Sequence, residues 1–177
     1  MSILKVARLG NPVLRNGTEA LPLDQLSSPA IQKLIDDMIE TMKEYDGVGL
    51  AAVQVHEPKK IAVLEVTDNP RYPNKPRVPL CVLVNPKITP LSEEIEEDWE
   101  GCLSIIDLRG KVPRYKGVRV EARDRNGNEL DFVASGFHAR VIQHEWDHLH
   151  GKVFLDRMRD LSSLTHLQEF ARYWTDE

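Results

Sequence analysis

The sequence predicts an α+β fold with mainly antiparallel sheet, because stretches typical of strands follow one another while the predicted helices lie apart. Two observations carry this prediction. Apolar residues recur at three- and four-residue spacing across residues 31–42, and residues 117–134 alternate around an Asn126-Gly127 turn signal. With 177 residues the chain has the length of one domain with a substantial core. We therefore expect residues 1–177 to form a single domain.

The first half of the chain contains one predicted helix and two predicted strands. Ser28-Pro29 is a typical N-cap and first helical position, and the apolar stripe that follows ends near Gly47. We interpret that stripe as core. Residues 60–67 and 80–85 are rich in strand-forming residues, and the polar, proline-rich residues 68–77 between them predict a surface loop.

The second half begins with a predicted hairpin and ends with two helices. Residues 117–124 and 130–134 flank the Asn126-Gly127 turn. A helix is expected over residues 136–150, with Ser135 as N-cap and Gly151 just beyond its end, followed by a short helix over residues 162–174. The expected architecture is antiparallel sheets packed around the helix of residues 136–150, with an N-terminal helix and a short C-terminal helix.

Composition excludes several classes of protein. A hydrophobic content of 41% and a charged content of 29% are those of an ordinary soluble protein. The formal net charge of −5 argues against broad binding to nucleic-acid phosphates. No apolar stretch approaches the length that spans a membrane. We therefore expect neither direct nucleic-acid binding nor a membrane segment.

The most informative motif is His144-Glu145-Trp146-Asp147-His148. Two histidines four residues apart on a helix differ by only about 40° in direction, so both imidazoles project from one face. Both can then reach one metal ion, and the glutamate beside the first can handle a proton on a metal-bound water. Apolar residues on two sides of the helix indicate that it is buried, where imidazoles need a partner. The hypothesis is a metal-dependent hydrolase; a purely structural histidine pair is the alternative.

A third protein ligand can be sought in three places. The pattern HExxHxxGxxH fails, because its last position is Phe154. Glu169 lies in the window of a later helix, where a solvent-facing charge is the more common interpretation. Cys102, in Glu100-Gly101-Cys102-Leu103-Ser104, is the better candidate, since a thiolate binds zinc or ferrous iron well, although a lone cysteine is usually a small buried apolar group. A ligand cysteine must be reduced, which suits the cytoplasm; Cys81 is interpreted as core.

A third segment, Gly47-Val48-Gly49-Leu50-Ala51-Ala52-Val53-Gln54, would by itself be interpreted as a helix end followed by a tight loop. Together, however, the patterns GxGLAAxQ, EGCLS and HExDH, in this order, resemble the peptide deformylase family. That family removes the formyl group from the N-terminal methionine of nascent chains. The resemblance covers nearly the whole chain, from residues 10–15 to residues 155–157.

The resemblance implies a metal site and a mechanism. Cys102, His144 and His148 would hold one divalent ion, Fe(2+) in the cell, with Zn(2+) or Ni(2+) possible as prepared. A metal-bound water would attack the formyl carbon, with Glu145 as general base and then general acid, releasing formate. The side-chain amide of Gln54 and the backbone N–H of Leu103 would stabilise the oxyanion.

The resemblance also implies how an N-formylmethionyl peptide binds. The peptide would lie extended beside the GxGLAAxQ strand and pair with backbone groups around Gly49, with its methionine side chain in a pocket that has His144 at its floor. Arg109 would lie near the peptide's path, with an exposed loop charge as the alternative. Glu100 is also expected to pair with an arginine such as Arg114, and Asp147 to be a structural partner. The residues expected at the substrate are Val48, Gly49, Leu50, Glu100, Gly101, Arg109, Phe137 and Val141, with Leu103 also lining the pocket.

The sequence departs from the family pattern at two places, and two other functions remain as alternatives. Ile106 stands where many deformylases carry proline. Thr175-Asp176-Glu177 follow soon after the last predicted helix, so the basic C-terminal helix by which some deformylases dock on the ribosome is not expected, although a transient association with the ribosome stays open. An HExxH zinc endopeptidase should cleave internal peptide bonds and should keep far more of its activity when Cys102 is replaced by serine. A non-catalytic metal-stabilised module needs a closed fourth position, for which the sequence offers no obvious ligand.

Overall fold

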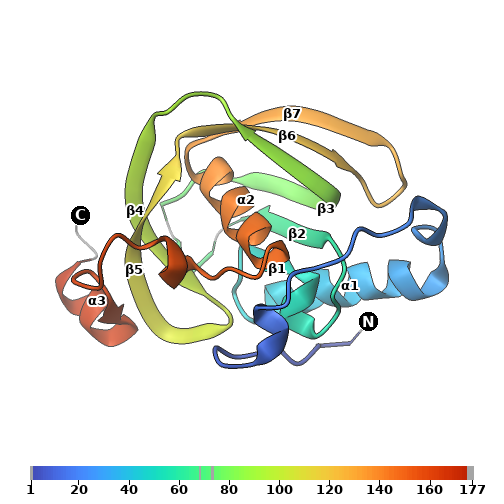
Figure 1. Cartoon of the computed structure of the whole chain (residues 1–177). Helices are drawn as coiled ribbons and strands as arrows, with labels where there is room; N and C mark the ends of the chain where they lie inside the picture. The colour runs from blue at the N-terminus through green and yellow to red at the C-terminus, as the bar shows by residue number, and fades with distance from the viewer. Residues whose placement is uncertain (1, 68, 73, 175–177) are drawn as a thin grey trace.

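The structure, a computed structural model, describes residues 2–67, 69–72 and 74–174 (Figure 1). Within them lie three α-helices, α1 (Pro29–Glu44), α2 (Gly136–Leu149) and α3 (Leu167–Tyr173). The strands are β1 (Gly49–Ala51), β2 (Ile61–Val66), β3 (Val78–Pro90), β4 (Ile95–Cys102), β5 (Ile105–Tyr115), β6 (Gly117–Arg123), β7 (Glu129–Ser135) and β8 (Thr165–His166). Short 3-10 helices cover Pro12–Leu14, Leu23–Gln25, Ala52–Val55 (η3) and Phe154–Arg157 (η4).

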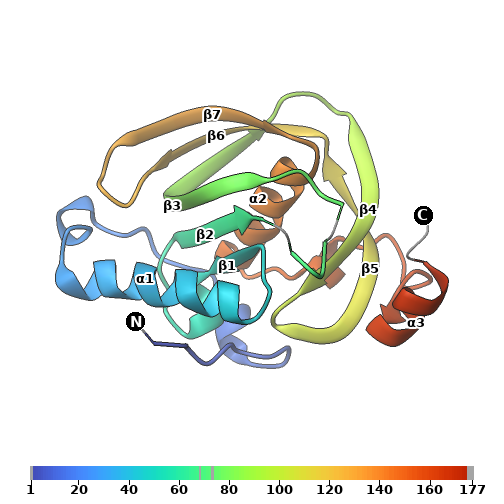
Figure 2. The same ribbon diagram turned by 180° about the vertical axis from the view of Figure 1, so that it is seen from behind.

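The strands form two sheets, which confirms the predicted α+β class. One sheet has the order β1-β2-β3-β6-β7 and the other the order β4-β5-β8, with antiparallel pairing between these strands. Helix α2 runs through the middle of the molecule between the two sheets, as the opposite views of Figures 1 and 2 show. No helix in the described part of the chain combines the length and apolar character needed to cross a membrane.

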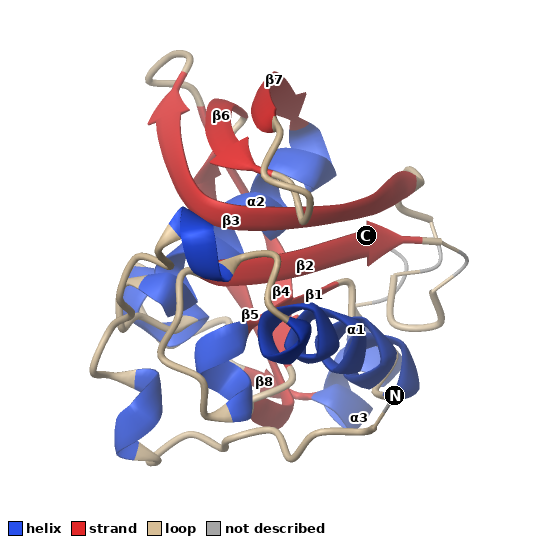
Figure 3. Cartoon of the chain, turned by 90° about the vertical axis from the view of Figure 1, so that its right-hand side faces the viewer, coloured by secondary structure: helices blue, strands red, loops and turns tan. Residues whose placement is uncertain are grey.

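Helix α1 forms where the sequence predicts it. Pro29 occupies the first turn, and the Ser28 side chain accepts a hydrogen bond from the backbone N–H of Ile31 at 3.4 Å. The apolar stripe faces β1 and β2, and in Figure 3 the helix lies alongside them. The buried residues of this cluster on α1 are Ile31, Ile35, Met38 and Met42. The helix ends at Glu44, three residues before the predicted limit.

The predicted hairpin is also confirmed. Strands β6 and β7 pair from Gly117 with Ser135 to Arg123 with Glu129. In the turn, the Asp124 carboxylate accepts backbone hydrogen bonds from Asn126 and Asn128, and Gly127 has a φ of +87°. A positive φ is readily available to glycine, which explains the turn signal.

Three predictions about the elements were wrong or incomplete. The local pattern gave no strand at β1, where only the family resemblance implied one, and none was expected over residues 86–115, yet β3 extends to Pro90 and the long β4–β5 hairpin carries the Cys102 motif. Half of the residues of β4 are charged, so its sequence lacks the apolar alternation that marks a strand. Helix α3 begins at Leu167 rather than at residue 162, because Thr165 and His166 pair with Arg109 and Leu108.

The expected surface loop between β2 and β3 is confirmed for residues 69–72 and 74–77, which form turns and bends. Asp68 and Pro73 of that loop lie outside the described residues, as do the C-terminal residues Thr175, Asp176 and Glu177.

Candidate metal centre

Helix α2 brings two histidines to the centre of the molecule. It begins after Ser135, whose side chain makes no capping hydrogen bond, and ends before Gly151, whose φ is +71°. A Cβ at Gly151 would lie 2.6 Å from the carbonyl oxygen of Arg15, so a side chain there has no room. The rings of His144 and His148 lie on one face with centroids 4.9 Å apart, and both are buried.

Cys102, at the end of β4, completes the set. Its Sγ lies 3.3 Å from Nε2 of His148, although the two residues are 46 apart in sequence. The three ligand atoms all lie within 4.8 Å of one another, and in the described residues no other group of three such side chains comes together. Donors around one tetrahedral zinc ion are about 3.3–3.6 Å apart, so this arrangement fits a single ion.

The alternative third ligand lies elsewhere. Glu169 is on the surface of α3, where its Oε1 is 3.3 Å from Nη1 of Arg172. The interpretation of Glu169 as a solvent-facing charge is therefore confirmed.

The electrostatics of the three side chains suit a cation. Burial opposes the thiolate, but the adjacent His148 and His144 hold the pKa of Cys102 well below its usual value. Burial also opposes the charged imidazole, but the neighbouring Cys102 and Glu100 raise the pKa of His144 well above its usual value. A thiolate with two imidazoles is a donor set for zinc or ferrous iron, so the residues present fit the implied metal.

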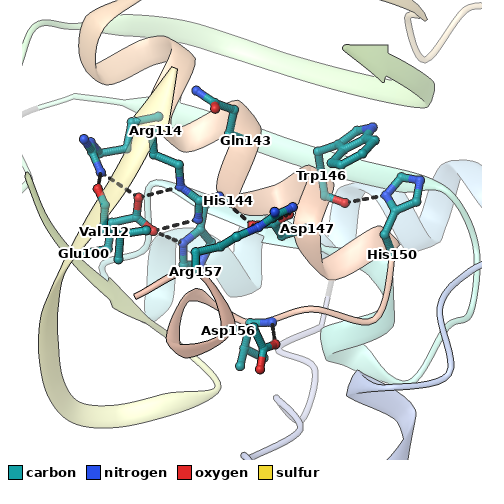
Figure 4. Close-up of polar contacts among 12 residues, drawn as sticks. Glu100, Val112, Arg114, Gln143, His144, Trp146, Asp147, His150, Asp156 and Arg157 are labelled. Carbon is teal, nitrogen blue, oxygen red and sulfur yellow. Dashed lines mark hydrogen bonds and ion pairs between the residues drawn. The ribbon is translucent and has the colours of Figure 1, made fainter. Parts of the chain in front are cut away.

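Glu100 orients His144. The His144 Nδ1 lies 2.9 Å from the Glu100 Oε2 (Figure 4). Burial raises the pKa of Glu100, but Arg114 and His144 together hold it far below its usual range, so the carboxylate is ionised and Nδ1 donates the hydrogen bond. With one ring proton held at Nδ1, Nε2 of His144 becomes free for an ion when it gives up the other proton. The expected pairing with Arg114 is present, at 2.9 and 3.0 Å, and Arg140 adds a contact at 2.9 Å.

Glu145 lies beside the ligands with an unused oxygen. Its Oε2 is buried and has no hydrogen-bond partner among the described residues. Burial raises the pKa of Glu145 to about 7, against the effect of the two neighbouring histidines. A Cβ at Gly49 would lie 2.8 Å from the Glu145 Cδ, so glycine leaves the space that this carboxylate occupies. The carboxyl group can therefore exchange a proton near neutral pH.

Gln54 is held rigidly beside Cys102. It is 1% exposed, and its Oε1 accepts a hydrogen bond of 2.8 Å from the backbone N–H of Ala51. This turns Nε2 toward the metal site, 3.1 Å from Oγ of Ser104 and 3.6 Å from Sγ of Cys102.

Residues 7–9 connect Gln54 with Leu103, and sequence reasoning missed them. Ala7 N–H donates to the carbonyl of Gln54 at 2.7 Å, and Leu9 N–H donates to that of Ser104 at 2.8 Å. Arg8 Nη1 donates to the carbonyl of Leu103 at 2.6 Å. No local sequence signal identifies these contacts, because their partners are remote in the chain.

A pocket opens beside the three ligands. Six of the residues expected at the substrate line it: Val48, Gly49, Glu100, Gly101, Phe137 and Val141. Gln54, Leu103, His144 and Glu145 line it as well. Arg71 and Tyr72, from the loop between β2 and β3, line the same pocket and were not singled out from the sequence.

Leu50 and Arg109 are placed differently from the other expected residues. The Leu50 side chain is fully buried in the apolar cluster under α1 and does not line the pocket. Arg109 is 3% exposed in β5, with its guanidinium over the ring of Tyr72 at 4.7 Å and that of Phe170 at 5.6 Å. The alternative of an exposed loop charge is therefore wrong. Ile106, the departure from the family pattern, is 51% exposed at the start of β5.

Comparison with known proteins gives consistent matches. Residues 3–163 match the family model described as polypeptide deformylase. The chain is 45% identical over 157 residues to peptide deformylase 1 of Bordetella pertussis, covering 89% of this chain and 88% of that protein. It is similar, with a TM-score of 0.86 and 40% identity, to the Met-Ala-Ser-bound class I type b peptide deformylase of Acinetobacter baumannii, covering 89% of this chain and 100% of that one. A peptide deformylase structure from Ehrlichia chaffeensis has a TM-score of 0.80 at 35% identity, covering 92% and 91% of the two chains.

Proposed function

The chain belongs to the polypeptide deformylase family and is a peptide deformylase, and from that premise we propose how its own residues carry out the reaction. The family assignment disfavours the endopeptidase and the non-catalytic module. The observation that carries the proposal is the convergence of Cys102, His144 and His148 beside an open pocket.

The metal site is the first part of the proposal. Cys102, His144 and His148 hold one divalent ion, with Fe(2+) as the native metal and Zn(2+) or Ni(2+) as substitutes. When bound, the ion supplies Lewis-acid activation of water at neutral pH. Glu100 keeps His144 in the tautomer that leaves Nε2 free, through the contact of 2.9 Å at Nδ1.

Glu145 is the group that moves the proton. Its buried, unpartnered Oε2 and its pKa of about 7 suit a base that accepts a proton from the attacking water. The new C–O bond on the formyl carbon gives a tetrahedral oxyanion, and its collapse breaks the bond between that carbon and the nitrogen of the methionine residue. Glu145 returns the proton to that nitrogen, so the products are formate and a free N-terminal amine.

Gln54 and Leu103 stabilise the oxyanion. The amide of Gln54 is fixed by its bond to Ala51, so it donates at the transition state without reorganising. The backbone N–H of Leu103 is the second donor, and the bonds from Arg8 and Leu9 hold the turn that carries it.

The substrate is an N-formylmethionyl peptide bound in extended form. Strand β1 lies at the edge of the five-stranded sheet, so the backbone of Gly49 can pair with an added strand. Val48, Phe137 and Val141 line the pocket and offer an apolar site for the methionine side chain. Gly101 also lines the pocket, and Arg109 packs against it, since a Cβ at Gly101 would lie 3.0 Å from Nη1 of Arg109.

We also propose the setting of the reaction. Residues 1–177 act as one deformylase domain on nascent chains in the cytoplasm, where Cys102 stays reduced. Any association with the ribosome is transient.

The decisive experiment measures formate release from formyl-Met-Ala-Ser by the Fe(II), Zn(II) and Ni(II) forms. A peptide that has no formyl group, and that offers only internal peptide bonds for cleavage, serves as the control substrate. We expect formate from the first and no cleavage of the second. Cleavage of the internal peptide without formate release would overturn the assignment.

A further inference from the structure

We propose that Arg157 is a positioning residue for the metal site, acting on His144 through Asp147, Arg114 and Glu100. The proposal rests on the metal site of the proposed function. Figure 4 shows these side chains as one connected group that runs from η4, past α2, to the end of β4. The group contacts the ligand His144 through Glu100 and includes Asp147, the residue before the ligand His148 on α2.

The chain of contacts begins at Asp147, whose side chain is 2% exposed. Arg157 Nε lies 3.1 and 3.0 Å from its two oxygens, and Nη2 lies 2.5 Å from Oδ1. Arg114 Nη1 reaches Oδ2 at 2.5 Å. Two guanidinium groups therefore share one buried carboxylate.

Arg114 carries the link to Glu100. Its Nη1 is on Asp147, while Nε and Nη2 form a fork on the two oxygens of Glu100 at 2.9 and 3.0 Å. The guanidinium is planar and rigid, so its direction is set by both carboxylates at once. The second oxygen of Glu100 then contacts Nδ1 of His144 at 2.9 Å.

Arg157 strengthens the two hydrogen bonds that Arg114 donates to Glu100. A buried carboxylate needs full compensation of its charge. With Arg157 present, Asp147 has a second cation and takes only one nitrogen of Arg114. Without it, Asp147 draws Arg114 away from Glu100, and the hydrogen bond that orients His144 loosens. Arg140 stays on Glu100 and limits the effect.

Arg157 is also the accessible end of the group. Its side chain is 35% exposed, against 5% or less for Glu100, Arg114, Arg140 and Asp147. A substitution there can weaken the group without placing an unpartnered charge at the centre of the protein.

The same turn offers a matched control. Arg15 forms an ion pair with Asp156, the neighbour of Arg157, and donates to the carbonyl of Gly151 at 3.4 Å. The Asp156 carboxylate also accepts a hydrogen bond of 2.8 Å from the backbone N–H of Val153. Arg15→Ala therefore removes an arginine that anchors η4 but leaves Asp147 untouched.

The test measures the zinc dissociation constant of the apo protein by competition with a chromophoric chelator, beside the melting temperature of each apo form. Changing a group that supports a ligand's hydrogen bond typically costs 10–100-fold in metal affinity. Because Arg157 acts through three intermediates, we expect Arg157→Ala to weaken zinc binding about ten-fold, at the low end of that range. Arg157→Lys, which keeps the charge but not the fork, should recover part of the loss. Arg15→Ala should bind zinc as the wild type does.

Three outcomes would overturn the inference. One is wild-type zinc affinity in Arg157→Ala with only a lower melting temperature. Another is equal weakening by Arg15→Ala, which would assign the effect to anchoring of η4. The third is a full effect of Arg157→Ala in an Asp147→Asn background, which would show that Arg157 does not act through Asp147. If the wild-type chain does not bind one zinc ion, the metal site of the proposed function is wrong, and the inference fails with it.

Discussion

Replacing Gln54 by alanine removes one hydrogen-bond donor from the site while leaving every metal ligand in place. The Gln54 amide is positioned by the bond from Ala51 to its Oε1 and lies 3.6 Å from Sγ of Cys102. The backbone carbonyl of Gln54 accepts a hydrogen bond from the backbone N–H of Ala7, and this bond remains in the variant, so the substitution does not detach the N-terminal segment.

The expected size follows from the role of the donor. One oxyanion donor contributes roughly 3–4 kcal/mol to transition-state stabilisation, and about 1.4 kcal/mol corresponds to a factor of ten in rate. Gln54→Ala should therefore lower kcat by about 100-fold or more, with KM nearly unchanged. The backbone N–H of Ala51 also loses its buried acceptor, which costs about 1–3 kcal/mol of stability. For a chain of this size that lowers Tm by several degrees and leaves the protein folded at 25 °C.

The assay is formate release from formyl-Met-Ala-Ser at 25 °C, with the metal content of each preparation measured in parallel. Ser104→Ala is the matched control, because it removes the hydroxyl that accepts from Nε2 of Gln54 at 3.1 Å but keeps the donor. It should turn over within a few-fold of the wild type. Near wild-type kcat in Gln54→Ala, at equal metal content, would refute the role of Gln54.

Three further predictions test the ligands, the pocket and the stability. Cys102→Ser should lose both bound metal and formate release, measured on the same sample; a variant that keeps metal and activity would remove the thiolate from the site. Gly49→Ala places a Cβ 2.8 Å from the Cδ of Glu145, which can swing aside, so kcat should fall at least about ten-fold while Tm changes little; an unchanged kcat would separate Glu145 from the reaction. Burial raises the pKa of Asp98, but the hydrogen bonds from Lys75 and from the backbone N–H of Trp99 lower it overall. The ionised Asp98 therefore stabilises the folded state above about pH 4, and this stabilisation is lost as the pH falls through the lower pKa of the folded state. Asp98→Asn should accordingly flatten the loss of stability below about pH 4 in urea titrations, and an acid limb identical to the wild type would contradict this.

The sequence identified the parts of the site that lie within one element or one short motif. His144 and His148 are related by the helical period alone, so their common face follows from their spacing. The same holds for the apolar stripe of α1 and the turn at Gly127, where the preference is local. The resemblance of three motifs to one family then supplied the ligand role of Cys102 and the roles of Gln54 and Leu103.

Only the tertiary structure decided how these parts meet. Cys102 reaches His148 across 46 residues because β4, a strand with little apolar alternation, packs against α2. Arg109 is buried, although as an isolated charge in the sequence it has no feature that says so. Arg157, Asp147 and Arg114 form one group because η4, α2 and β5 come together. The physical reason is that hydrogen bonds and ion pairs between remote segments depend on how the elements pack, and packing leaves no periodic signal in the sequence.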